Sequence, residues 1–174
     1  MKKTVLLLAA FFCLLASWAQ QKGGFTSKAA MARDFIKPQA LATGVAAADI
    51  DQMKVSSETF SKHSGLTNVY FQQTVNGIPV FNAMLNVHIT RDNKLLTYGN
   101  RFVKVDDAVR SRMANPLLNP EQAVKAAMAS LGMPAAGSLV KKQSGNAPLY
   151  LTVFDKGKIS LEDIRVQLVY QPME

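Results

Sequence analysis

The residues that could hold a metal ion or act as a nucleophile are few in this chain. It has two histidines, His63 and His88, which lie 25 positions apart, and a single cysteine, Cys13. Protein zinc sites use three or four Cys, His or carboxylate ligands, and His or Cys pairs usually recur at short spacing. One cysteine also excludes a disulfide framework within the chain. We therefore expect no metal ion and no cofactor to be bound here.

The remaining candidates for catalysis are equally weak. The acidic pairs Asp106-Asp107 and Glu162-Asp163 are sequence neighbours on turn-like segments, where both carboxylates are solvated and neither is set apart as an acid or a base. No serine stands in a Gly-x-Ser-x-Gly nucleophile elbow, and no Gly-x-Gly-x-x-Gly or Walker phosphate loop is present. These absences predict that the chain is not an enzyme.

The charge balance indicates the kind of partner. The 174 residues include 20 Lys and Arg against 12 Asp and Glu, a formal net charge of +8, and 48% are hydrophobic, which excludes a disordered tail. The basic residues between positions 53 and 105 are scattered through turns and strand ends. They are not interleaved with aromatic residues, as a nucleic-acid stacking surface would require. We expect no nucleic-acid partner, and an acidic protein surface suits this charge better.

The N-terminus has the three parts of a secretory signal peptide. Lys2 and Lys3 form a basic start, an apolar run of about 12 residues follows, and Ser17 and Ala19 are small residues at a cleavage site. An N-terminal membrane anchor is the alternative, but a spanning helix needs about 20 apolar residues. We expect residues 1–19 to be removed after Ala19, together with Cys13. The mature protein would be secreted, extracellular or periplasmic, with no membrane segment and a charge of 18 − 12 = +6.

The pattern of the first part of the mature chain predicts one helix followed by an antiparallel meander. Apolar residues at helical spacing over 29–36 predict a helix that either ends near Ile36 or kinks at Pro38. Residues 41–62 are expected to form a connecting loop with a short turn around Asp49–Met53. Strands are expected at 69–75, 81–89 and 95–103, the first two joined by the hairpin dipeptide Asn76-Gly77 and the last two by a turn at 91–94.

Within the second of these strands, period-two alternation assigns one face to the core. That face comprises Phe81, Ala83, Leu85, Val87 and Ile89. Pro79 lacks an N–H group and therefore belongs at the start of the strand or on an edge.

A second helix-then-strands unit is expected after a linker at 106–118. Asn119 is a helix N-cap, Pro120 occupies the first helical position and Gln122 can complete a capping box. The expected buried stripe comprises Val124, Ala127, Met128 and Leu131. Strands are expected at 138–142, 148–154 and 164–170. The whole chain is thus predicted to be α+β, with helices packed on antiparallel sheets in two small units, 22–105 and 119–174.

One segment of the first unit resembles a known family. The segment 65–103, GLTNVYFQQTVNGIPVFNAMLNVHITRDNKLLTYGNRFV, is similar to the fungalysin/thermolysin propeptide domain found ahead of fungalysin-type zinc metallopeptidases. The matching features are Gly65, Val69-Tyr70, Gln72-Gln73, Asn76-Gly77-Ile78-Pro79-Val80, Phe81-Asn82-Ala83 and Leu85-Asn86-Val87. The family usually has Gly where this chain has Asn93, and Asn tolerates the positive φ that the turn needs. Residues 117–171 resemble the PepSY-like half of such precursors.

The resemblance implies a cystatin-like pro-region that inhibits a secreted zinc endopeptidase and helps it fold. The expected partner is the cognate catalytic domain, in cis, and that domain would hold the zinc, since His-Glu-x-x-His is absent from this sequence. A free-standing secreted protease inhibitor or protein-binding module is the alternative. The expected contact region with the protease is the hairpin, represented by Gln73, Asn76, Gly77, Pro79 and Asn82.

The signal peptide gives the first testable prediction. The exported protein should begin at Gln20, because Ser17 and Ala19 fit the small −3 and −1 positions of the cleavage site. N-terminal sequencing of the exported protein measures this directly. A protein that retains Met1, or one that carries a lipid on Cys13, would contradict the assignment.

Overall fold

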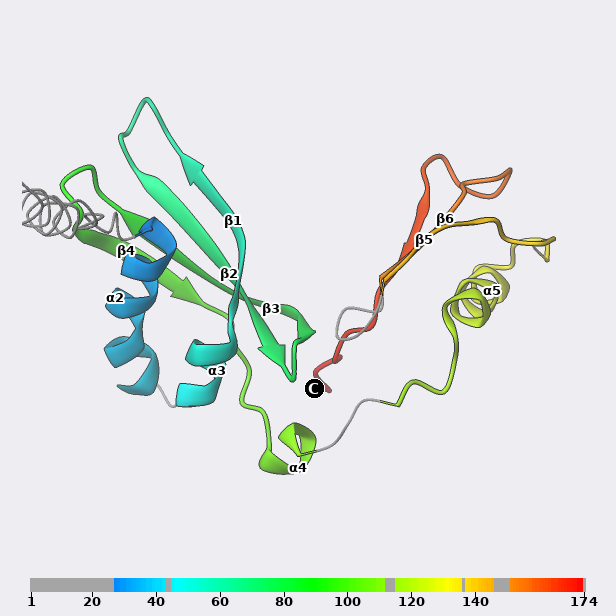
Figure 1. Cartoon of the computed structure of the whole chain (residues 1–174), viewed down its shortest axis with the longest axis horizontal. Helices are drawn as coiled ribbons and strands as arrows, with labels where there is room; N and C mark the ends of the chain where they lie inside the picture. Colours follow the sequence, from blue (N-terminus) through cyan, green and yellow to red (C-terminus); the bar gives the residue numbers. More distant parts are fainter. Residues whose placement is uncertain (1–26, 43–44, 112–114, 136, 146–150, 174) are drawn as a thin grey trace, which may run out of the picture.

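The computed structural model describes residues 27–42, 45–111, 115–135, 137–145 and 151–173 (Figure 1). These residues form two antiparallel sheets with helices, one of four strands in the order β1-β2-β3-β4 and one of three in the order β5-β6-β7. The expected α+β class, with helices packed on antiparallel sheets, is confirmed. Residues 1–26, which include the expected signal peptide, lie outside the described residues.

The elements follow one another in two groups. The first comprises α2 (Lys28–Ala42), α3 (Ala47–Gln52), β1 (Lys54–Phe60), β2 (Thr67–Val75), β3 (Ile78–Ile89), β4 (Leu95–Asn100) and the short α4 (Asp107–Arg110). The second comprises α5 (Pro120–Ser130), β5 (Lys141–Ser144), β6 (Thr152–Phe154) and β7 (Ile164–Val166).

The helices α2 and α3 cover one face of the four-stranded sheet. Ala32, Ile36 and Ala40 recur every four residues along α2 and are buried against the sheet. The helix continues through Pro38, so it does not end near Ile36, and Ala40 beyond the proline is 1% exposed. The sheet contributes Val69, Phe71, Leu85, Val87 and Ile89 to this core.

The strand β1 was not expected, since residues 41–62 have no period-two pattern. All seven of its residues are exposed, and β1 is an edge strand that pairs with β2 alone. Backbone pairing, which is independent of side-chain type, is what makes this segment a strand. The expected turn around Asp49–Met53 is present as the helix α3.

The predicted core face of β3 is correct from Ala83 to Ile89 and wrong at Phe81. Phe81 is 48% exposed, whereas Val80 is 2% exposed and buried. The strand β3 carries extra residues here. Gln72 pairs with Met84 and Thr74 with Pro79, so two positions along β2 correspond to five along β3. An irregularity of this kind exchanges the two faces of a strand on either side of it.

The second unit begins with the expected capped helix. The side chain of Asn119 accepts a hydrogen bond from the Gln122 backbone N–H, and the Gln122 side chain accepts one from Asn119, so the capping box is complete. Val124 and Met128 are buried, but Ala127 and Leu131 are exposed, contrary to expectation. The sheet of three short strands is small, so it buries only one stripe of α5, formed by Val124 and Met128 at positions i and i+4.

Leu85 is the most direct test of this fold. We predict that Leu85→Asp unfolds the first unit, because it removes about 2 kcal/mol of apolar burial and places an unpaired carboxylate in the core. Leu96→Asp on the neighbouring strand is the matched control, since Leu96 is 56% exposed and Leu85 is fully buried. Urea unfolding measures both variants, and an equal loss of stability would contradict the register of β3.

Candidate functional site

The β2–β3 hairpin turn has the backbone that its sequence predicts. Asn76 has a φ of 51° and Gly77 a φ of 80°, and Val75 pairs with Ile78 across the turn. Positive φ at both central residues is the type I′ arrangement, which Asn-Gly adopts at low cost. Pro79 is the second residue of β3, so its expected place at the start of a strand is confirmed.

Gln73 of this hairpin is an internal structural residue. Its side chain is fully buried and donates hydrogen bonds to the Asp49 carboxylate at 3.0 Å and to the Val103 carbonyl at 2.8 Å. It also accepts a bond from the Val103 N–H at 2.9 Å. The amide therefore substitutes for a neighbouring strand and holds the segment that follows β4 against the hairpin.

Asp49 and Arg110 complete a buried polar cluster with Gln73. An Arg110 Nη2 lies 2.8 Å from Asp49 Oδ2, and the two side chains are 16% and 2% exposed. The Arg110 carbonyl accepts a bond from the Asn76 side chain at 2.8 Å. The start of the expected linker is thus fixed to the first unit through α4, and the linker boundaries at 106 and 118 remain a prediction.

A second set of hydrogen bonds shapes the irregular part of β3. The Gln72 amide donates to the carbonyls of Val80 at 2.7 Å and Ala83 at 3.0 Å, with Asn82 between them at a φ of 57°. Outside Gly, this left-handed conformation is most accessible to Asn and Asp. The bonds fix a backbone arrangement that leaves Phe81 on the surface.

The C-terminal segment adds to the same place. The Phe81 N–H donates to the Tyr170 carbonyl at 2.8 Å, and the Tyr170 N–H donates to the Pro79 carbonyl at 2.9 Å. Val80 and Tyr170 form a parallel bridge. A segment that follows the three-stranded sheet therefore pairs with the start of β3 in the four-stranded one (Figure 1).

The five residues expected to contact a protease differ in how exposed they are. Asn76 and Asn82 are exposed, Gly77 and Pro79 are half-buried, and Gln73 is buried. The hairpin thus remains a candidate contact region, but Gln73 supports it from within. Sequence reasoning missed Asp49 and Arg110, which have no local pattern that signals their pairing. It also missed Gln72 and Tyr170, whose contacts lie in distant segments.

Of the two histidines, His88 is held in place by side chains of its own sheet. His88 lies between two amides, with Nδ1 2.6 Å from Asn68 Oδ1 and Nε2 2.8 Å from Asn86 Nδ2. Among the described residues, no group of three or more His, Cys, Asp or Glu side chains could hold a metal ion. Within the same ranges, no helix is long and apolar enough to cross a membrane.

Part of the charge of the second unit is paired at its surface. Lys142 Nζ lies 3.0 Å from carboxylate oxygens of both Asp163 and Asp155. These hydrogen bonds raise the pKa of Lys142 above its usual value. The pKa of Asp155 is lowered, first by the Gly157 N–H and then by Lys142. The groups are well exposed, so the pairs add little stability.

The buried ion pair provides a test of the cluster. We predict that Asp49→Ala lowers the free energy of unfolding by about 3 kcal/mol, because it leaves the Arg110 charge largely buried without its partner. Asp51→Ala should cost under about 0.5 kcal/mol, since the Lys37–Asp51 pair is exposed. Chemical denaturation of both variants measures the difference, and equal effects would show that the Asp49 pair is dispensable.

Comparison with known proteins shows what this fold is related to. Residues 51–102 match the family model described as the Fungalysin/Thermolysin Propeptide Motif. Extracellular metalloproteinase 10 of Coccidioides posadasii is 31% identical over 119 residues, which cover 67% of this chain and 18% of the relative. Extracellular metalloproteinase mep of Aspergillus terreus is 31% identical over 121 residues, with the same shares. Extracellular metalloproteinase 2 of Phaeosphaeria nodorum is 29% identical over 116 residues.

The extent of these matches defines what they establish. The chain spans about a fifth of the length of the curated relatives it matches. The family match ends at residue 102, so the resemblance of 117–171 to a PepSY-like unit stays a prediction. The matched residues are those of the strands β1 to β4, which run from Lys54 to Asn100. This chain therefore contains a fungalysin/thermolysin propeptide motif, and that motif forms its four-stranded sheet.

Proposed function

We propose that the chain is the pro-region of a secreted zinc metalloendopeptidase, which it inhibits and helps to fold. The observation that carries the proposal is the agreement between the propeptide motif, 51–102, and the complete four-stranded sheet, 54–100. The motif thus covers all four strands of the sheet, whereas α2 and most of α3, which pack on one of its faces, precede it in the sequence. The relatives that align over two thirds of the chain are named extracellular metalloproteinases.

The rigidity of the hairpin supports an inhibitory role. Asn76-Gly77 fixes its turn, the buried Asp49–Gln73–Arg110 cluster holds the part of β2 next to the turn, and Gln72 fixes its irregular strand. A surface that is already ordered loses little conformational entropy on binding, so more of the contact energy remains as affinity. The charge of 18 − 12 = +6 that remains after removal of the signal peptide favours an acidic partner and speeds association at low salt.

The folding role follows from the same binding equilibrium. A folded pro-region that binds the native protease, and not its unfolded chain, stabilises the native state by mass action. In cis, a linker raises the effective concentration of the pro-region to the millimolar range for short flexible connections. Zinc would belong to the catalytic domain, and this chain would be non-catalytic. Export through the N-terminal signal would bring both parts to the same compartment.

The free-standing inhibitor or binding module shares the binding step but not the folding step. An inhibitor would slow hydrolysis by the mature protease without raising the yield of active enzyme from denatured protease. A pro-region would do both. The two activities therefore need to be measured with the same protein.

The experiment titrates the purified chain against the mature extracellular metalloproteinases of Coccidioides posadasii, Aspergillus terreus and Phaeosphaeria nodorum. We expect slower hydrolysis of a short fluorogenic peptide by at least one of them, and a higher refolding yield of that protease. Raising the salt concentration should lower the association rate, because screening weakens long-range attraction between charged surfaces.

The control is the Leu85→Asp chain, which has the same composition apart from one residue but should be unfolded. An unfolded chain can slow hydrolysis of the peptide simply because the protease digests the chain instead. The Leu85→Asp chain measures this effect. The proposal fails if neither activity is seen with any of the three proteases up to about 100 μM, where an interface worth roughly 5–6 kcal/mol would register. It also fails if the Leu85→Asp chain inhibits equally well.

A further inference from the structure

A hollow of about 390 Å³ lies where the open face of the four-stranded sheet meets the segment before Tyr170. Gln72 and Thr74 of β2 line it, and apolar side chains come from Phe81, Met84 and Val169. Phe81 is 48% and Val169 37% exposed, so the apolar part of the lining is accessible from outside. The helices α2 and α3 pack on the opposite face of this sheet.

The exposure of Phe81 is built into the strand. A regular strand would place Phe81 on the same face as Ala83 and Leu85, which are buried. The left-handed Asn82 and the bonds of Gln72 to the Val80 and Ala83 carbonyls prevent this. A non-glycine residue held at positive φ by specific hydrogen bonds is a conformation that persists only where surrounding structure enforces it. Here its effect is to present an aromatic ring at the surface.

The lining of the hollow contains a positive charge. Lys54 is the charged residue of its lining, and no Asp or Glu is among the described residues that line it. A hollow that is partly apolar and has a lysine in its lining is complementary to a protein surface that presents an apolar side chain beside a carboxylate.

We infer that this hollow is the docking site for the mature metalloproteinase, with Phe81 as the anchor and Lys54 as an orienting charge. The inference rests on the proposed function and adds the surface through which it acts. Aromatic residues that fill a partner's pocket carry a large part of the energy of many interfaces. A second copy of this chain is a poorer occupant, because it brings the same excess of positive charge.

The first experiment compares Phe81→Ala with Phe60→Ala in the inhibition assay described above. Phe60 is 58% exposed on the same sheet but does not line the hollow, so it controls for loss of an exposed aromatic ring. We expect Phe81→Ala to raise the inhibition constant roughly tenfold or more and Phe60→Ala to change it less than about twofold. Both variants should keep the denaturation midpoint of the unaltered chain, because neither ring is buried.

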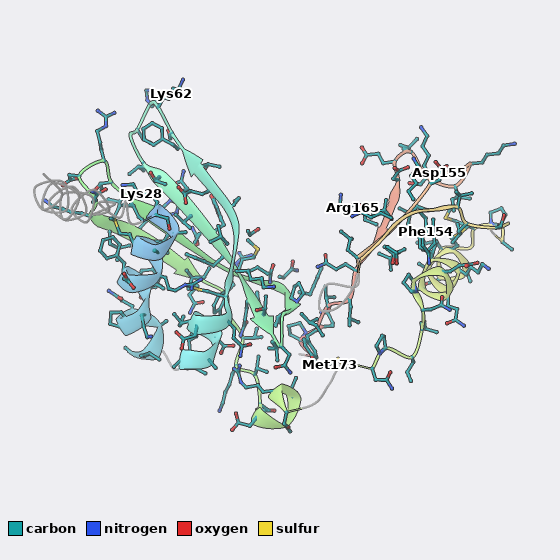
Figure 2. The ribbon with its side chains drawn as sticks, viewed as in Figure 1. Lys28, Lys62, Phe154, Asp155, Arg165 and Met173 are labelled. Atoms are coloured by element: carbon teal, nitrogen blue, oxygen red, sulfur yellow. The ribbon has the colours of Figure 1, made fainter. Side chains whose placement is uncertain are left out.

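The second experiment tests the charge. Lys54→Glu should lower the association rate severalfold and reduce its dependence on salt, whereas Lys62→Glu should do neither. Lys62 lies in the turn between β1 and β2, at the far tip of the sheet (Figure 2). The two variants change net charge equally, so a difference between them reports the location of the partner.

The outcomes distinguish this inference from the proposed function. If the unaltered chain inhibits and Phe81→Ala inhibits equally well, the docking site is wrong and the pro-region proposal stands. If the unaltered chain has no effect on any protease, both are wrong. If the chain is a dimer by size-exclusion chromatography and Phe81→Ala makes it a monomer, the hollow is a self-association surface and the inference is overturned.

Discussion

The buried contact of Asp49 with Gln73 and Arg110 is the interaction on which the arrangement of the hairpin depends. A carboxylate that is 2% exposed would strongly disfavour folding if it were unpaired. Here Oδ1 accepts from Gln73 and Oδ2 from Arg110, so both oxygens are paired. The three residues belong to α3, β2 and α4, and the Gln73 amide extends the contact to Val103. One charge therefore specifies how four separate segments meet, which apolar packing alone would leave less determined.

The irregularity of β3 divides the strand into two parts with different exposure. From Leu85 to Ile89 its odd-numbered residues pack beneath α2 and α3, and this packing stabilises the unit. Before Ala83 the alternation is shifted, so that Val80 is buried and Phe81 is exposed. Gln72 holds the shift from the neighbouring strand, and Tyr170 pairs with the backbone beside it. Polar contacts thus hold Phe81 at the surface and Val80 in a small core with Val75 and Ala83.

The sequence predicted the parts of the fold that local chemistry determines. Asn76-Gly77, the alternation in 69–75 and 83–89, and the capping box of Asn119 and Gln122 each act over a few residues. The edge strand β1 was missed because its pairing requires nothing of its side chains. Gln73 was assigned to a partner surface. It lies on the same face of β2 as the buried Val69 and Phe71, and this alternation indicated an internal role. Phe81 and the Asp49–Arg110 pair depend on contacts between distant segments, which no local pattern contains.

Hydrogen exchange followed by mass spectrometry is the most direct test that this chain acts by binding a metalloproteinase through the open face of its propeptide sheet. The chain would be compared alone and with a mature relative in which the Glu of His-Glu-x-x-His is replaced, so that it is not digested. The account predicts slower exchange in the peptides that contain residues 79–84 and 167–170, with little change in α2. Unchanged exchange throughout the chain, or protection confined to α2 and α3, would contradict it.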